Sequence, residues 1–123
     1  MPAEMRPSFL SFDSCPVTAT IGIIGGKWKV IILYLIAYGY NRFGEMHSMI
    51  EGISKKMLTD QLRELEKDGI IHREVYAQIP PKVEYSITDK GLTLRPIILA
   101  MSAWGMKYIL KDTTAPSGEE MEG

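Results

Sequence analysis

A helix with clear start and stop signals, followed at once by two alternating strands, limits most strongly how this chain can fold. Ser54 suits the N-cap of a helix that runs from Lys55 to Asp68, and Gly69 suits the residue that ends it. Leucines recur at helical spacing along one face of this segment, at Leu58, Leu62 and Leu65. The pattern therefore predicts a helix with one buried face and one exposed face.

The segments on either side of this helix complete a recognisable unit. Ile70 to Ala77 and Lys82 to Ile87 alternate in polarity like half-buried strands. They are joined by Gln78 to Pro81, whose two prolines cannot donate to a ladder and therefore predict a stiff turn. Upstream, a short helix over Gly44 to Ile50 closes at Glu51-Gly52. A short helix, a tight turn and a capped helix indicate a helix-turn-helix, and the ribbon after it indicates a wing.

Helices are also predicted before this unit. Cys15-Pro16 opens the first of them, because proline suits the first helical position, and Gly25-Gly26 stops it. A second helix over Lys27 to Tyr38 is apolar on nearly every face, so we expect it at the centre of the fold. The pair Arg42-Phe43 is compatible with a very short strand.

The last helical region starts at a cap formed by Thr88 and reaches about Leu110, and Pro96 should kink or divide it. We assign one apolar stripe of this region to the core: Ile97, Met101, Trp104 and Tyr108. Further apolar residues lie on its other faces and in the N-terminal arm: Ile98, Leu99, Ala103, Phe9, Leu10 and Phe12. A monomer would leave these exposed, and exposed apolar patches mark interfaces, so the pattern favours a homodimer.

The fold class predicted from these elements is α+β but mainly α: a winged helix-turn-helix with a two-stranded β wing and terminal dimerisation helices. The 123 residues suit one domain. We expect an N-terminal arm at residues 1–14 and the winged helix-turn-helix domain with its dimerisation helices at residues 15–111. Residues 112–123 are predicted to be a disordered acidic tail, because they show no periodic apolar pattern.

The distribution of charge permits a nucleic-acid partner. The net charge is −1, but all 14 basic residues and only 11 of the 15 acidic residues lie within residues 1–111, which gives that part a net charge of +3. The longest apolar run, Val30 to Tyr38, is far shorter than the roughly 20 residues that cross a bilayer. Met1 to Ser14 also lacks the apolar core of a secretory signal. These features predict a soluble, cytoplasmic protein with no membrane partner.

The outward face of the capped helix carries the candidate DNA contacts. A helix that enters the major groove by its N-terminal end presents small donors and cations early. The predicted DNA-binding residues are Ser54, Lys55, Lys56, Thr59 and Arg63, with Lys82 at the tip of the wing. The alternative is a solvated amphipathic face, with Lys82 as an ordinary surface lysine. Two further arginines, Arg42 and Arg73, are as compatible with structural ion pairs as with phosphate contacts.

Catalytic and metal chemistry find little support in the sequence. The two histidines, His47 and His72, lie in no ligand or general-base spacing, so we predict no enzyme, no metal and no cofactor. Cys15 is the one cysteine, which excludes an intramolecular disulfide. Its place at a helix N-terminus favours the reactive thiolate, and Lys27 and Lys29 follow one helix later. Cys15 is therefore either a redox sensor or a small packing residue.

Short motifs follow one another along nearly the whole ordered chain: Cys15-Pro16-Val17, Ile24-Gly25-Gly26-Lys27-Trp28, Arg42-Phe43-Gly44-Glu45, Gly52-Ile53-Ser54, Leu62-Arg63-Glu64-Leu65-Glu66, Pro80-Pro81 and Trp104-Gly105. In this order they closely resemble the HxlR-type branch of the MarR-like transcription regulators. The resemblance implies a homodimer of winged helices that binds double-stranded DNA at a pseudo-palindromic operator. It implies a groove-reading helix at Ser54 to Arg63 and a wing at Val75 to Tyr85.

The resemblance also bears on two single residues. Some relatives sense oxidants or electrophiles through a cysteine at the position of Cys15. Asp60 stands where relatives often carry glutamine or arginine, and it would either accept from a cytosine or hold Arg63. The sequence thus predicts a sequence-specific DNA-binding regulator. The alternative is a winged-helix module that binds another protein without DNA, and the operator, the sign of regulation and any small-molecule effector stay open.

Overall fold

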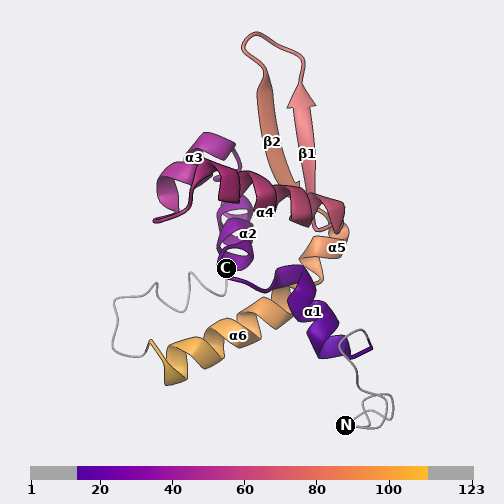
Figure 1. The fold of residues 1–123 in the computed structure, drawn as a ribbon, viewed down its shortest axis with the longest axis vertical. Helices are drawn as coiled ribbons and strands as arrows, with labels where there is room; N and C mark the ends of the chain where they lie inside the picture. The colour runs from indigo at the N-terminus through magenta and orange to yellow at the C-terminus, as the bar shows by residue number, and fades with distance from the viewer. Residues whose placement is uncertain (1–13, 111–123) are drawn as a thin grey trace.

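The computed structural model describes residues 14–110 and is mainly helical over that range (Figure 1). Its elements in chain order are α1 (Pro16–Ile24), α2 (Lys29–Ala37), α3 (Phe43–Met49), α4 (Lys55–Lys67), β1 (Ile71–Tyr76), β2 (Lys82–Ile87), α5 (Asp89–Leu92) and α6 (Arg95–Tyr108). The architecture is the winged helix-turn-helix that the sequence predicted. The predicted tail at residues 112–123 and nearly all of the arm at residues 1–14 lie outside the described residues.

The helix-turn-helix is formed by α3 and α4. The turn between them contains Gly52 at a φ of 87°, a left-handed conformation that glycine adopts without a steric penalty. Gly69 follows Asp68, the C-cap residue of α4, and ends this helix in the same left-handed conformation, with a φ of 75°. The predicted inward stripe of α4 is confirmed, because three leucines have essentially no exposed surface: Leu58, Leu62 and Leu65.

The core lies between α2, α4 and the base of the wing. Ile32 of α2 is fully buried, and Leu33 and Ile36 are buried beside it, which confirms the predicted central place of this helix. Over residues 14–110, no single helix is both long and apolar enough to cross a membrane, and α1 and α2 pass that test only as a pair bent by 64°.

The wing is an antiparallel ribbon of β1 and β2. Its register runs from Ile71 opposite Ile87 at the base to Tyr76 opposite Lys82 near the tip. Ile71 is buried, whereas every residue from 72 to 80 is exposed. Strand β1 therefore leaves the core after its first residue, whereas β2 still contributes the buried Tyr85, opposite Arg73. Beyond this point the ribbon projects past α4 into solvent (Figure 1).

Most predicted element boundaries differ from the structure by one residue, and two predictions differ more. Phe43 is the first residue of α3 and does not belong to a strand. Close to it, the Tyr85 N–H of β2 donates one hydrogen bond of 3.0 Å to the Asn41 carbonyl. One such bond does not make a ladder, since neighbouring residues must also pair. The second helix begins at Lys29 rather than Lys27. The predicted division near Pro96 is confirmed, because this proline stands in the first turn of α6, after α5 has ended.

The burial of α6 is the reverse of what its sequence predicted. The stripe assigned to the core is 43–58% exposed at Ile97, Met101, Trp104 and Tyr108. No residue of α6 is fully buried, and the helix instead packs through the half-buried Ile98 and Leu99. The sequence identified the stripe correctly, but helical periodicity cannot tell which surface covers it.

Candidate nucleic-acid interface

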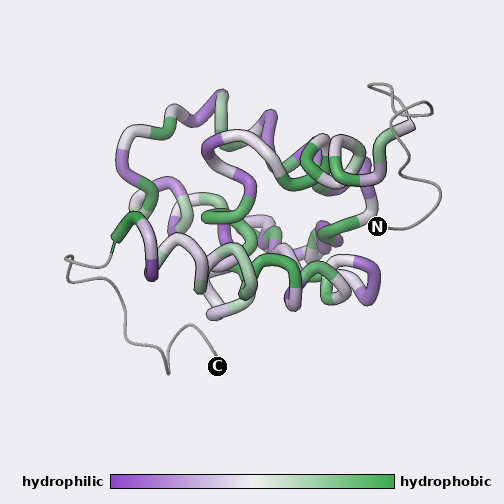
Figure 2. Tube along the Cα trace, turned by 90° about the horizontal axis from the view of Figure 1, so that it is seen from below, coloured by the Kyte–Doolittle hydropathy of each residue, from purple (hydrophilic) through white to green (hydrophobic). Residues whose placement is uncertain are grey.

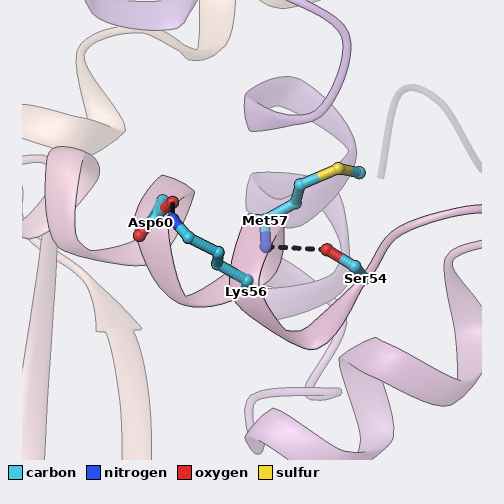
Figure 3. A network of polar contacts seen from close by, with 4 residues as sticks. All are labelled: Ser54, Lys56, Met57 and Asp60. Atoms are coloured by element: carbon cyan, nitrogen blue, oxygen red, sulfur yellow. Dashed lines mark hydrogen bonds and ion pairs between the residues drawn. The ribbon is translucent and has the colours of Figure 1, made fainter.

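The N-terminal end of α4 is organised by the predicted cap. The Ser54 hydroxyl oxygen accepts a hydrogen bond from the Met57 backbone N–H at 3.0 Å (Figure 3). This bond satisfies one of the amides that have no partner within the helix, and the Ser54 hydroxyl still has its own proton to donate. Because the other N-terminal amides and the positive end of the helix dipole point outward here, this turn suits a phosphate group.

Lys56 and Asp60 form an ion pair on the exposed face of α4. The Lys56 Nζ atom lies 2.8 Å from Asp60 Oδ2, one helical turn further on (Figure 3). Pairs of this kind on a helix surface are worth only about 0.3–0.5 kcal/mol. Asp60 therefore holds Lys56 rather than Arg63, and a phosphate could replace the carboxylate at little cost.

The other predicted contacts on α4 differ in exposure. Lys55 and Arg63 are exposed and have no ion-pair partner within residues 14–110, whereas Thr59 is half-buried. Lys56, Thr59 and Arg63 follow one another at helical spacing, so they share one side of α4. The structure thus brings the α4 candidates together on a single surface.

Lys82 lies near the tip of the wing, but its side chain packs against the ribbon. It is the first residue of β2 and is half-buried, with its Nζ atom 4.9 Å from the centre of the Tyr76 ring and 3.5 Å from Glu84 Oε2. Lys82 thus lies beside the turn, as predicted, but its ammonium contacts an aromatic face and a carboxylate of the ribbon and does not extend freely into solvent. The turn at the tip, residues 77–81, is apolar apart from Gln78, and Ile79 within it is completely exposed.

Arg42 and Arg73, for which the sequence left two interpretations open, are both exposed. Neither forms an ion pair with another residue of the described range. Arg42 is the residue before α3, and Arg73 lies in the middle of β1. Within the described residues, the structural ion pairs considered for these two arginines are therefore not formed.

The ion pair between Lys29 and Glu64 was not predicted. The Lys29 Nζ atom lies 2.7 Å from Glu64 Oε1, and Lys29 is only 5% exposed, whereas the Glu64 side chain is about half exposed. The pair joins the first residue of α2 to the helix that carries the DNA candidates. It therefore links the orientation of α4 to the central helix. A lysine inside an otherwise apolar segment is the one signal in the sequence for such a pair.

Loss of Glu64 should destabilise the protein more than loss of Lys29. Glu64→Ala leaves a buried ammonium without its carboxylate and should cost about 1–3 kcal/mol in the free energy of unfolding. Lys29→Met replaces the charge with an apolar chain of similar length and leaves Glu64 hydrated, so it should cost less than about 1.5 kcal/mol. Urea denaturation measures both. If both variants lose the same free energy of unfolding, then a buried Lys29 without Glu64 carries no extra cost, and the expectation is wrong.

Cys15 is the N-cap residue of α1 and is half-buried. The hydroxyl of Thr18, followed by the backbone N–H of the same residue, holds the pKa of the Cys15 thiol below its ordinary value, and partial burial opposes this effect. The two lysines considered as activators have other contacts. Lys29 binds Glu64, and the Lys27 Nζ atom lies 4.9 Å from the centre of the Trp28 ring.

The two histidines have structural contacts. His72 Nε2 lies 3.1 Å from Glu74 Oε1, and the His47 ring stacks on Phe43 with their centres 6.4 Å apart. Within residues 14–110, no group of three or more histidine, cysteine, aspartate or glutamate side chains could hold a metal ion.

Known proteins resemble this chain over most of its length. The model of the HxlR-like helix-turn-helix family matches residues 23–113. YdeP, an uncharacterized HTH-type transcriptional regulator of Bacillus subtilis (strain 168), is 59% identical over 97 residues, which are 79% of this chain and 76% of YdeP. The structure of the redox regulator HypR in its oxidized form is 56% identical with a TM-score of 0.71, covering 76% of this chain and 96% of HypR. The reduced form of YodB from B. subtilis is 33% identical with a TM-score of 0.69, covering 80% and 98%.

Proposed function

Because the chain belongs to the HxlR-like helix-turn-helix family, we propose that this transcriptional regulator binds a pseudo-palindromic DNA operator in a sequence-specific manner, as a homodimer in the cytoplasm. The family consists of transcriptional regulators and not of enzymes. The observation that carries the proposal is the exposed face of α4, which gathers donors and cations around the N-terminal turn of a capped helix beside a projecting wing.

The proposed contacts to DNA divide between bases and phosphates. Arg63 is long and exposed, so it suits a guanine edge in the major groove. Ser54, Lys55 and Lys56 surround the helix N-terminus and suit phosphates, with Lys56 exchanging Asp60 for a phosphate oxygen. Thr59 adds a hydroxyl between them. We assign Lys82 to the phosphate backbone beside the wing, where it would have to leave Tyr76 and Glu84.

The proposed dimer interface lies at the end of the molecule opposite the wing, where α1 and α6 are found (Figure 1). Figure 2 looks at this end from below and shows long hydrophobic stretches of the trace. Exposed apolar side chains contributed by the two helices form what we call the seam: Val17, Ile21, Ile97, Met101, Trp104 and Tyr108. A two-fold axis through the seam would place two copies of α4 on half-sites about 34 Å apart, with residues 15–111 as the unit that binds DNA and dimerises.

Selection from randomised duplexes with the purified protein tests the proposed function. We expect a motif with two-fold symmetry, because each subunit of a symmetric dimer reads one half-site. The affinity for that motif should fall steeply as the salt concentration rises, since phosphate contacts release counterions. A module that binds only another protein would enrich no sequence.

We further infer that Cys15 is the site of a redox or electrophile response. Its lowered pKa increases the fraction of reactive thiolate, and it stands at the start of α1, a helix that contributes to the seam. The redox regulator HypR, at 56% identity, is the relative that motivates this role. Since each chain holds one cysteine, a disulfide at Cys15 must join it to a thiol of another molecule, either the second subunit or a small thiol.

Diamide should weaken operator binding by the wild-type protein by about tenfold or more, the effect of roughly 1.4 kcal/mol at the seam. Diamide oxidises two thiols to one disulfide and takes up their two hydrogens. The Cys15→Ser variant lacks the reacting sulfur, so its affinity for the operator should not change when diamide is added. A mobility-shift titration with and without diamide measures both. If wild-type protein keeps its affinity after mass spectrometry has verified the disulfide, Cys15 is a packing residue.

The Thr18→Val variant tests whether the Thr18 hydroxyl controls the reactivity of the Cys15 thiol. Valine keeps the shape of threonine but lacks the hydroxyl that lowers the pKa of Cys15. The Cys15 pKa should therefore rise, and alkylation by iodoacetamide at pH 7 should slow, because less of the sulfur is thiolate at a pH below the pKa.

A further inference from the structure

The turn at the end of the wing, residues 77–81, presents a single large apolar side chain. Ile79 is completely exposed, and no residue of this turn carries a charge. Pro80 and Pro81 follow it, and each proline ring fixes its own φ, so the backbone that carries Ile79 is stiff. The wing therefore ends in an alkyl group on a rigid support.

The charged residues of the ribbon stand behind this end. The last register pair before the turn joins Tyr76 to Lys82, and the Lys82 ammonium lies over the Tyr76 ring. The acidic pair of Glu74 and Glu84 stands two positions further back, about 7 Å at roughly 3.4 Å per residue. The charged residue nearest to the turn along the ribbon is thus a lysine, which suits an approach to a negatively charged partner.

The ribbon is long enough to carry Ile79 from α4 to a neighbouring groove of a duplex. Strand β1 packs beside α4, and the ribbon projects past this helix (Figure 1). Ile79 follows the buried Ile71 by eight residues, which span at most about 26 Å at roughly 3.3 Å per residue. The centres of adjoining major and minor grooves are half a helical turn apart, about 17 Å. A tip beside a helix in the major groove therefore reaches the next minor groove.

The small size of the tip favours DNA over a protein as its partner. A stable protein interface buries about 800 Å² on each side, and one large apolar side chain on a narrow turn supplies little of this. The minor groove is about 6 Å wide, so a single side chain fits into it. Isoleucine and proline are among the side chains that proteins insert between base pairs from this groove, which kinks the duplex.

We propose that Ile79 inserts from the minor groove between two base pairs next to each half-site, and that the protein thereby bends its operator. This inference rests on the proposed function, since α4 must first bind in the adjoining major groove. Insertion separates two stacked base pairs, which costs least at flexible pyrimidine–purine steps such as TA and more at stiff AA steps. The wing therefore recognises the flexibility of one base step, whereas α4 recognises base edges.

Operator duplexes with a TA or an AA step at successive positions around each half-site test this proposal. Energy transfer between dyes at the two ends of the duplex measures bending, and a mobility-shift titration measures affinity. At one position, the same in both half-sites, the wild-type protein should bind the TA duplex about tenfold more tightly than the AA duplex, within the range for one changed base pair. The bound TA duplex should be bent by about 20–90°.

Two variants of the full-length protein show whether Ile79 causes these effects. Ile79→Ala is too short to separate base pairs, so the bend should be lost and the ratio of the two affinities should fall to about one. Ile79→Leu is the matched control and should keep both effects, because leucine also serves as a wedge. Since Ile79 is completely exposed, both variants should melt at the wild-type temperature.

The outcomes separate the wedge from operator recognition itself. If the wild-type protein binds its operator without bending it, or if the bend and the preference for TA persist in Ile79→Ala, the proposal is wrong while DNA binding by α4 stands. The tip would then be left for a protein partner. If the wild-type protein selects no operator at all, the proposed function fails, and this inference fails with it.

Discussion

Trp104→Glu should convert the proposed dimer into a monomer and weaken operator binding by about 10²–10⁴-fold. Trp104 is the most exposed of the four apolar residues that α6 contributes to the seam, so a carboxylate there would face the partner copy in a desolvated interface. A monomer reads one half-site, and it loses the gain in affinity that comes from linking two binding modules, about 10²–10⁴-fold. Light scattering at micromolar concentration and a mobility-shift titration measure the two effects.

The control for this variant lies on the same helix. Ala103 is exposed but sits roughly 130° around α6 from the middle of the seam, so Ala103→Glu adds the same charge away from the interface. It should stay dimeric and bind the operator normally. Glutamate at Ile98 or Leu99 would not serve, because these residues are half-buried on the inner face of α6 and the change would damage folding. Wild-type protein that is monomeric at micromolar concentration would refute the proposed dimer.

Arg63→Ala should weaken operator binding by about 5–150-fold, which corresponds to the 1–3 kcal/mol of a lost bidentate base contact. The Arg63 side chain is exposed and has no ion-pair partner within the described range, so its removal should change the free energy of unfolding by no more than about 0.5 kcal/mol. A mobility-shift titration and a thermal melt on the same sample separate these two effects. Loss of affinity that tracks loss of stability would contradict a role in base recognition.

The lysines at the start of α4 should behave differently from Arg63. Lys55→Ala/Lys56→Ala should weaken binding to all sequences alike and reduce the slope of log affinity against log salt by about 1.8, or 0.9 for each phosphate contact. Lys67→Ala is the matched control, since it removes an exposed lysine from the last turn of the same helix. If the double variant and this control bind with equal affinity, the N-terminal end of α4 does not face the DNA.

Local patterns were enough to predict most of the fold. The cap at Ser54, the leucine stripe of α4 and the alternation in the wing each depend on neighbours within a few residues, so the sequence carries them directly. The exposed cations of α4 followed for the same reason, because a helix with a known buried face has a known outer face. The strand at Arg42-Phe43 failed because pairing requires a partner that is distant in sequence.

The sequence by itself therefore determined the order of elements, the inward face of α4 and the set of side chains on its outer face. Only the tertiary structure decided which apolar stripe is covered, and it turned the α6 stripe toward solvent. It also decided where charged groups find partners, by placing Lys29 against Glu64 and Lys82 over Tyr76. The physical reason is that the spacing of apolar residues shows only which face of a helix or strand is apolar, and not what covers that face. Burial, ion pairing and cavities arise only when surfaces that are remote in sequence meet.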